Sequence, residues 1–330
     1  MESTTPLTHI AEYYSVRTDD LTEVAAAPVF LRPAFFELQR AHTDRAFYFR
    51  LVSDACEQTL AVAPVFHVGN GRYATPLRGS FGGFFFAPRR VSFDVAEAFV
   101  REVEARLLDG GMREWVITLP PAAYAAEASV LANIFWRLGY HVQRHDLNYA
   151  LPITAVDIAD GFNRGNRKNL RRAQRSGWRV RKLDATQLKA AYDLIVANRT
   201  HRGFSVTMTW DDLWETHEKL AGVISAFGVF DGDSLIASSI CLAVSTEIFY
   251  VFYWGQLPGV DNPSPLPLLA QALYEYGREN GFQLLDLGTS TDDGEPNYGL
   301  IRFKRSLGFQ ESLKLRFAKR FDAVAKEAES

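Results

Sequence analysis

Residues 247–320 alternate between apolar runs that suit strands and amphipathic runs that suit helices. The expected elements are, in order, a strand at Ile248–Trp254, a helix at Pro265–Arg278, a strand at Leu284–Leu287, a helix that carries Arg302, Lys304 and Arg305, and a strand at Glu311–Lys319. In an open α/β sheet, ligands bind beyond the carboxyl ends of the strands, near a reversal of strand order. The pattern therefore predicts a site formed by Tyr253–Gln256 and Asp286–Ser290.

The length and composition indicate a globular α/β protein with two domains. The chain has 330 residues, of which 47% are hydrophobic and 23% charged, and a domain usually spans roughly 100–200 residues. We place the domains at residues 1–152 and 153–330. The formal net charge of −3 gives no global attraction to nucleic acid, so any basic site must be local.

The cysteines and the apolar runs indicate the cellular setting. Cys56 and Cys241 are too few for a disulfide framework, which favours a reduced, cytoplasmic location. The polar N-terminus does not have the pattern of a signal peptide, and no apolar run reaches the roughly 20 residues of a membrane span. The sequence leaves the oligomeric state open.

The first half has a series of strand and helix patterns that follows a loosely organised stretch at residues 1–27. The expected elements are a helix at Pro33–Arg40, strands at Ala46–Val52, Gln58–Phe66 and Arg72–Pro76, a helix at Val95–Leu108, a strand at Glu114–Leu119, a helix at Glu127–Leu138 and a strand at Tyr140–Leu151.

The second half begins with the basic stretch at residues 161–182 and a strand at Trp178–Leu183. Two helices are then expected, Ala185–Thr200, with Asp184 and Gln187 as a capping box, and Trp210–Leu220, which Thr209 and Asp212 begin. Strands at Ile224–Phe230, Leu235–Val244 and Ile248–Trp254 follow, so the two halves share an order of three strands, helix, strand, helix and strand.

A glycine-rich run follows Arg78 and contains Gly79, Gly82 and Gly83. Glycine permits close backbone approach, so the run and Arg78 could bind an anion. The alternative is a bend between a strand and a loop, because the spacing and the Lys-Ser/Thr pair of a P-loop are absent.

Residues 161–182 contain nine basic residues and no acid. Five of them recur at helical spacing and form one stripe: Arg164, Arg167, Lys168, Arg171 and Arg175. Like charges on one helix face repel each other, and arginine binds phosphate through two hydrogen bonds. The stripe therefore predicts a phosphate-binding helix, in which Arg167, Lys168, Arg171 and Arg175 bind substrate; the alternative is a solvated face paired with acids elsewhere.

The repeated order of elements resembles two tandem GNAT domains, each a mixed, mostly antiparallel sheet flanked by helices, in the Fem-type arrangement. Three local patterns carry the resemblance: the basic helix and glycine at Asn169–Trp178, the strand end at Tyr253–Gly255, and the Phe-Lys element within Asn297–Phe309. The resemblance implies an acyltransferase that uses an acyl-CoA thioester as co-substrate or, alternatively, an aminoacyl-tRNA donor. The acceptor would be an amine of a small molecule or phosphorylated sugar.

The main helix of the second half departs from the GNAT pattern for binding CoA pyrophosphate. Its approach, residues 257–267, contains Pro258, Pro263, Pro265 and Pro267, which have no amide proton to donate. Ser264 remains as a candidate cap, so the expected cofactor-binding residues are Gly255, Gln256 and Ser264.

Acyl transfer to an amine needs a positioned carbonyl, a route for the proton and stabilisation of the oxyanion. The candidate catalytic residues are Lys304, which the resemblance matches to the Phe-Lys lysine, Asp286 as a base or as a residue that orients one, and Tyr253. The candidate substrate-binding residues at this end are Thr289, Ser290 and Asn297.

The histidines form no zinc-ligand pattern, so no metal is expected. Two alternatives to an enzyme remain open. One is a catalytically silent GNAT-like binding module, and the other is binding of phosphate or nucleic acid through residues 164–182.

Overall fold

The computed structural model describes residues 13–18, 20–24, 26–87, 90–124 and 127–321. The chain forms two compact units, Met1–His145 with Leu313–Ser330, and Asp146–Ser312. The boundary that we placed between residues 152 and 153 differs from this division, because most of the last strand belongs to the first unit. In β15 (Gln310–Arg320), residues 316–320 pair with β6 (Glu114–Thr118) of the first unit, whereas in β7 (His141–Pro152), residues 148–152 pair with β12 (Leu284–Thr289) of the second.

In the first unit, a mixed, mostly antiparallel sheet is covered by helices on both faces. Its strand order is β1 (Tyr14–Arg17), β2 (Ala46–Ser53), β3 (Gln58–His67), β4 (Arg72–Thr75), β6 and β15, with the short β5 (Phe85–Phe86) paired to β3. Among the described strand pairs of this unit, only β4 and β6 run parallel. Within its described residues, the helices are the short η1 (Val29–Leu31), α2 (Pro33–Arg40), α3 (Phe93–Asp109) and α4 (Glu127–Arg137). The predicted positions of these three α-helices are confirmed.

The alternation of side chains along the strands explains this layering. Phe49 and Val65 belong to the core formed with α3 and α4, whereas the adjacent Tyr48 and Phe66 meet Phe36 of α2. Successive strand residues point to opposite faces, so each apolar strand supplies both layers.

The expectation that residues 1–27 are loosely organised was wrong at β1. This strand pairs with residues 50–53 of β2. Its four residues, Tyr14–Arg17, lie at the edge of the sheet and only one of them is buried, so the strand gives little apolar periodicity.

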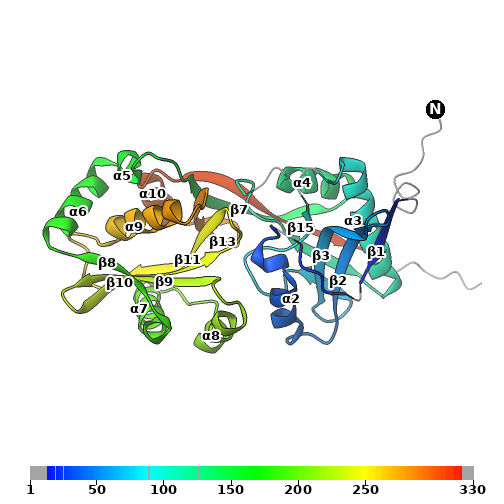
Figure 1. Cartoon of the computed structure of the whole chain (residues 1–330), viewed down its shortest axis with the longest axis horizontal. Helices are drawn as coiled ribbons and strands as arrows, with labels where there is room; N and C mark the ends of the chain where they lie inside the picture. Colours follow the sequence, from blue (N-terminus) through cyan, green and yellow to red (C-terminus); the bar gives the residue numbers. More distant parts are fainter. Residues whose placement is uncertain (1–12, 19, 25, 88–89, 125–126, 322–330) are drawn as a thin grey trace, which may run out of the picture. The chain divides into compact units, whose positions relative to one another are not determined.

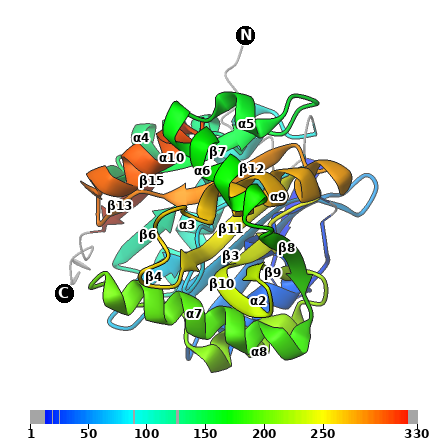
Figure 2. The same ribbon diagram turned by 90° about the vertical axis from the view of Figure 1, so that its left-hand side faces the viewer.

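The second unit repeats the arrangement with strand order β7, β12, β11 (Ile248–Gln256), β10 (Ser234–Ala243), β9 (Ile224–Asp231) and β8 (Arg179–Leu183). The short α5 (Ile158–Gly161), α6 (Arg164–Arg175), α9 (Leu266–Glu279) and α10 (Tyr298–Ser306) lie over one face (Figure 1). The short η2 (Ala185–Gln187), α7 (Leu188–His201) and α8 (Trp210–Lys219) lie over the other, as the end-on view also shows (Figure 2). A hairpin of β13 (Thr291–Asp292) and β14 (Glu295–Pro296) connects β12 to α10.

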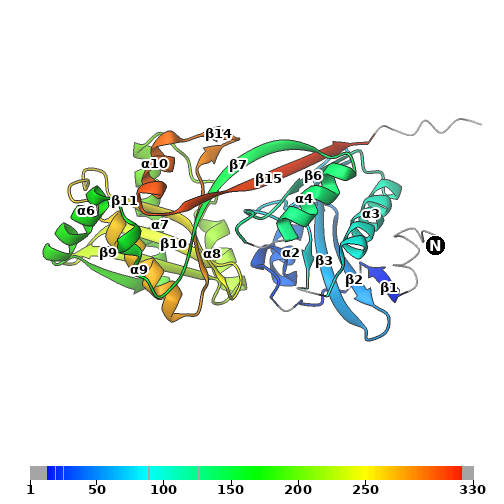
Figure 3. The same ribbon diagram turned by 90° about the horizontal axis from the view of Figure 1, so that it is seen from above.

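Local sequence signals set several of these helix ends. The side chains of Asp184 and Thr209 accept hydrogen bonds from the amides three residues on, and Gln187 and Asp212 reciprocate. The sequence predicted the capping box at Asp184 and the start of a helix at Thr209, and both are confirmed. The mixed sheets with flanking helices confirm the predicted fold class, and the β2–β7 and β9–β15 orders confirm the internal repeat (Figure 3).

The assignment of β15 to the first unit can be tested at Phe317. This residue is 2% exposed, and the centre of its ring lies 5.6 Å from that of Phe135 in the core of the first unit. We expect Phe317→Ala to lower the unfolding free energy by about 3–5 kcal/mol, because it leaves a cavity in that core. Urea denaturation measures the loss, and hydrogen exchange should show it at the β6 amides. Leu313→Ala, on the same strand at a 47% exposed position, is the control. Lost protection at β12 with β6 unchanged would contradict the assignment of this strand.

Candidate functional site

The candidate site lies where two parallel strands part. The strands β11 and β12 pair only from Ile248 opposite Leu284 to Tyr250 opposite Asp286. Beyond that point, β11 continues along β10 as far as Gln256, while β12 shifts register and pairs Thr289 with Asn148 of β7. The predicted site at these carboxyl ends therefore corresponds to a real divergence of the strands.

Two backbone irregularities shape the divergence. On β12, Gly288 has a φ of +72°, and a Cβ there would lie 3.0 Å from the Tyr250 ring, so the position favours glycine on both counts. On β11, the register shifts between Ile240 opposite Tyr253 and Cys241 opposite Val251, which leaves Phe252 as an extra residue. Such a bulge redirects the side chains that follow it.

Lys304 connects α10 to the end of β12. Its side chain is buried, and its Nζ donates hydrogen bonds of 2.8 Å to the carbonyls of Gly288 and Thr289. Nζ also lies 5.6 Å from the centre of the Tyr149 ring. Burial lowers the pKa of Lys304 to about 7, and the Asp286 carboxylate acts in the opposite direction by raising it. The third ammonium proton has no acceptor among the described residues.

Asp286 lies beside this lysine and is likewise buried. Its Oδ1 accepts hydrogen bonds of 2.9 Å from the Asn148 side-chain amide and 2.6 Å from the Gly288 backbone amide. The carboxylate thus holds the turn of the chain at Gly288 and supplies a negative charge near the lysine. The structure brings Asp286, Lys304 and the carbonyl of Thr289 together.

Ser290 and Asn297 are joined through the backbone, since the Asn297 amide donates to the Ser290 carbonyl at 2.9 Å. The Asn297 side chain caps α10 by accepting from the Leu300 amide. The Ser290 hydroxyl is buried and has no hydrogen-bond partner in the described part of the chain. A buried polar atom of this kind is costly unless it is used, so the Ser290 hydroxyl is a candidate donor to a bound substrate.

Two neighbours of this cluster, Asn148 and Tyr149 on β7, were absent from the sequence-based set. They lie about 140 residues before Asp286 and about 155 before Lys304 in the chain, and strand pairing brings them close. The available signal was the polar Asn148 within the otherwise apolar segment Leu147–Leu151.

The structure does not bring Tyr253 into this cluster. Its hydroxyl accepts hydrogen bonds from the amides of Thr207 and Met208, at 3.1 and 3.2 Å, and shares a 2.7 Å hydrogen bond with the Thr207 hydroxyl. Tyr253 therefore holds the loop between α7 and α8, on the face of the sheet opposite α10.

Gly255 and Gln256 organise the proline-rich segment that follows β11. The Gln256 side chain donates to the Val260 carbonyl and the Asp261 carboxylate, at 2.7 and 2.6 Å, and accepts from the Ser264 hydroxyl at 2.8 Å. A Cβ at Gly255 would lie 3.0 Å from Asn198. These three predicted cofactor-binding residues thus lie together, and their hydrogen bonds and close packing hold the loop.

The first turn of α9 presents few amide donors. Pro265 and Pro267 have none, and the Leu266 amide makes a 3.4 Å contact with Ser264. The N-terminus of α9 is therefore a poor anion site compared with a helix whose first amides are all present.

The predicted basic stripe lies on the exposed side of α6, while Leu170 and Ala173 are buried. Within the part of the chain that the structure describes, none of its cations forms an ion pair with an acid. Two contacts fix the helix: the Asn166 side chain donates to the Ser306 hydroxyl at 2.7 Å, and Arg172 donates to the Asn262 side chain. The helix is thereby attached both to the end of α10 and to the proline-rich loop.

In the first unit, the amides of the glycine-rich run are largely occupied. Gly82 donates to the Thr118 carbonyl, Gly83 to the Thr75 hydroxyl, and the Arg78 amide to the Gln39 side chain. A Cβ at Gly82 would lie 2.5 Å from the Thr75 hydroxyl. This geometry matches the bend interpretation, with glycine needed for close packing against β4.

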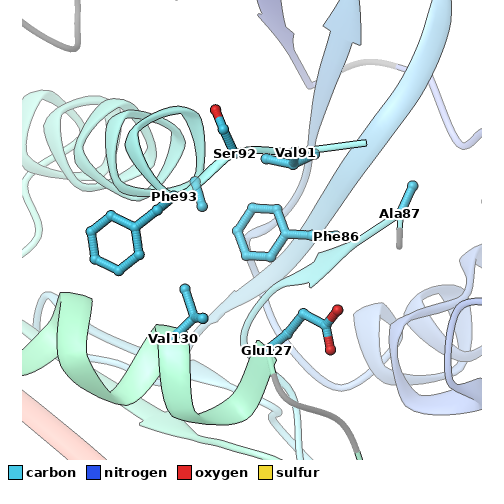
Figure 4. Close-up of a pocket in the computed structure, with 8 residues that line it drawn as sticks. Phe86, Ala87, Val91, Ser92, Phe93, Glu127 and Val130 are labelled. Carbon is cyan, nitrogen blue, oxygen red and sulfur yellow. The ribbon is translucent and has the colours of Figure 1, made fainter. Parts of the chain in front are cut away.

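The first unit also has a small apolar hollow between the beginnings of α3 and α4, with a volume of about 160 Å³. Phe86, Phe93 and Val130 surround it, and the Glu127 carboxylate lies at its margin (Figure 4). It contains none of the predicted site residues. Among the described residues, no cluster of histidine, cysteine and acid side chains could hold a metal ion, and no described helix is long and apolar enough to span a membrane.

Comparison with known proteins identifies the fold. No family model matches the sequence, and no curated protein matches it. Among solved structures, FemX is 13% identical with a TM-score of 0.67, each chain covered to 97%. L-PGS from Bacillus licheniformis is 14% identical, with a TM-score of 0.55 over 92% of this chain and 96% of that one. A tandem GNAT protein from the clavulanic acid biosynthesis pathway is 10% identical, with a TM-score of 0.51 over 93% and 98%.

The lowered pKa of Lys304 predicts how stability changes with pH. The folded chain loses the Lys304 proton near pH 7, whereas the unfolded chain holds it to about 10.5. Between these values the unfolded state binds more protons, so this residue makes the unfolding free energy rise with pH. Denaturant melts of the wild type and Lys304→Met at pH 7 and pH 9.5 should show a steeper rise in the wild type. If the unfolding free energies of the two proteins changed with pH in parallel, the pKa of Lys304 would not be lowered in the folded chain.

Proposed function

We propose that this chain, which has the tandem GNAT fold in its Fem-like form, is an N-acyltransferase. It moves an acyl or aminoacyl group directly from a thioester or a tRNA ester to an amine of a phosphorylated or sugar-linked acceptor. The observation that carries the proposal is the buried Lys304 at the parting of β11 and β12. In its ammonium form, which it keeps below about pH 7, two protons bind backbone carbonyls and one is left over.

In the proposed reaction, the acceptor nitrogen attacks the acyl carbonyl carbon. The bond from that carbon to the donor's sulfur or oxygen breaks, and the leaving thiol or hydroxyl takes up the proton that the amine loses. The spare Lys304 proton is directed at the carbonyl oxygen, where negative charge develops, and the site needs no covalent acyl-enzyme.

The neighbouring groups fix the position of the Lys304 side chain. Asp286 and Asn148 fix the backbone at Gly288, whose carbonyl is one of the two that hold Nζ. Ser290 offers a hydroxyl to the substrate, and Asn297 sets the start of α10. Tyr253 receives no chemical step in this scheme, because its hydroxyl already binds the loop at Thr207.

The basic face of α6 would bind the acceptor's phosphates. Arg167, Lys168, Arg171 and Arg175 are exposed, and the anchors of α6 at Ser306 and Asn262 attach the helix to the elements that follow β12 and β11. Guanidinium groups bind phosphate through paired hydrogen bonds. Because the first turn of α9 has few amide donors, we expect it to contribute little to binding the pyrophosphate of CoA. Acyl-CoA nevertheless remains one of the two proposed acyl donors.

The basic face also favours a second candidate, a binding module without catalysis. Such a module would keep the phosphate affinity of α6 and show no turnover. Activity measurements separate the two candidates.

Turnover is the direct test of the proposed chemistry. Melting-temperature shifts with CoA, acetyl-CoA, longer acyl-CoAs and UDP-linked sugars select the ligands, since a ligand at 100 times its Kd stabilises by about 2.7 kcal/mol. With an active pair, we expect Lys304→Met to lower kcat by about 10²–10³ with a small change in KM, because a single oxyanion donor is lost. Arg302→Ala, an exposed cation on the same helix, is the control. Near-normal turnover of the Lys304 variant would remove it from the mechanism.

Binding of acceptor phosphates by α6 has a different kinetic signature. We expect Arg167→Ala and Arg171→Ala to raise the acceptor KM about tenfold each, with kcat nearly unchanged, because they remove binding common to the ground and transition states. Arg278→Ala, an exposed arginine at the far end of α9, should change neither value. Reduced kcat at unchanged KM in both stripe variants would contradict a role in acceptor binding.

A further inference from the structure

The apolar hollow between the beginnings of α3 and α4 has no part in the proposed acyl transfer. Its walls come from three elements, with Phe86 on β5, Phe93 at the start of α3 and Val130 on α4. Both rings line the hollow, and Val130 lies below them in the view of Figure 4. The volume of about 160 Å³ is close to that of a cavity that holds one benzene molecule, so the hollow suits a single compact apolar group.

The Phe86 ring is fixed by its packing inside the first unit. It is 5% exposed, it stacks on the Phe84 ring with 6.2 Å between the ring centres and 7° between the planes, and it meets the Phe99 ring edge-on at 6.3 Å. The backbone of β5 is held in turn, because Phe86 pairs with Ala61 of β3. A wall that is already rigid loses little conformational entropy when a ligand binds to it.

Phe93 forms the exposed wall of the hollow. Its side chain is 43% exposed, although Val95 and Ala96 beside it on α3 are buried. The Arg137 guanidinium lies over the ring, 5.8 Å from its centre. The face of an aromatic ring attracts cations, and this contact shows that the Phe93 ring is open to one.

Glu127 places a carboxylate at the margin of the hollow (Figure 4). The glutamates of α3 that have a cation as partner are Glu97 with Arg101 and Arg137, Glu102 with Arg106, and Glu104 with Lys319. Glu127 forms no ion pair within the part of the chain that the structure describes. It begins α4, where a carboxylate stabilises the helix N-terminus, and a cation in the hollow would supply the counter-charge that the described residues do not provide.

We propose that this hollow binds a small organic cation with a compact apolar body, of the quaternary ammonium class. The methyl groups of a trimethylammonium head would contact Phe86, Phe93 and Val130, and the charge would be attracted by the ring faces and by the Glu127 carboxylate. The inference does not rest on the proposed function, which concerns residues of the second unit.

The test compares choline with its neutral analogue, in which a carbon atom replaces the nitrogen and the shape is retained. Both are titrated into the full-length protein, and binding is followed by the NMR shifts of backbone amides. We expect choline to bind about tenfold more tightly, because its charge adds attraction to the rings and to the carboxylate. The shifts should gather at the amides of Phe86, Phe93, Ala96 and Val130.

Four variants locate the binding. Glu127→Gln should reduce the preference for choline to about threefold, because only the attraction to the rings remains. Phe93→Ala should weaken the binding of choline about fivefold, and Val130→Trp should abolish the binding of both compounds by filling the hollow. Trp136→Ala is the control, since this ring of α4 is 70% exposed and does not line the hollow. Melting temperatures verify that the variants are folded.

Four results would overturn the proposal. Equal affinities for choline and the neutral analogue in the wild type would remove the preference for a cation, and an absence of shifts at the four amides would remove the site. A loss in Trp136→Ala as large as that in Phe93→Ala would mean that choline contacts any exposed ring. Binding that survives Val130→Trp would place the ligand outside the hollow.

Discussion

The buried ammonium of Lys304 is the interaction on which the second unit's site depends. A desolvated cation is expensive unless polar groups surround it, and here the Gly288 and Thr289 carbonyls and the Asp286 charge do so. Those carbonyls are available because β12 leaves β11 after Asp286. The divergence of β11 and β12 therefore supplies the acceptors that the buried lysine needs, and the lysine in turn satisfies the carbonyls that the divergence leaves unpaired.

This dependence extends outward through backbone and side-chain hydrogen bonds. Asn297 fixes the start of α10 and Ser306, near its end, binds Asn166 of α6. The orientation of Lys304 and the position of the basic face are consequently coupled through one short helix. The electrostatic repulsion within α6 is tolerated because its apolar side packs inward and both of its ends are fastened.

The sequence predicted the elements of both units well, because their periodicity, turns and caps are local properties. The stripe of α6, the capping box at Asp184, the helix start at Thr209 and the Phe-Lys element all lie where the sequence placed them. The edge strand β1 was missed, since four mostly half-exposed residues give no clear period. The division of the chain shifted because β15 completes the first sheet, a pairing between residues about 200 positions apart.

In the candidate site, too, the sequence predicted what depends on neighbouring residues and failed where distant segments decide. Residues on one segment, such as Asp286, Thr289 and Ser290, could be grouped from the sequence because a strand end is a local feature. The direction of Tyr253 could not, since a bulge at Phe252 and the loop at Thr207 decide where its hydroxyl points.

The sequence by itself determined the repeated order of strands and helices, the gathering of basic residues on one face of α6 and the residue types available for acyl transfer. These follow from spacing and composition along the chain. Only the tertiary structure decided that Asn148 and Tyr149 join the lysine, that Gln256 holds a loop, and that the Tyr253 hydroxyl binds Thr207. Those facts depend on strand pairing, register and burial between distant segments, which no local pattern contains.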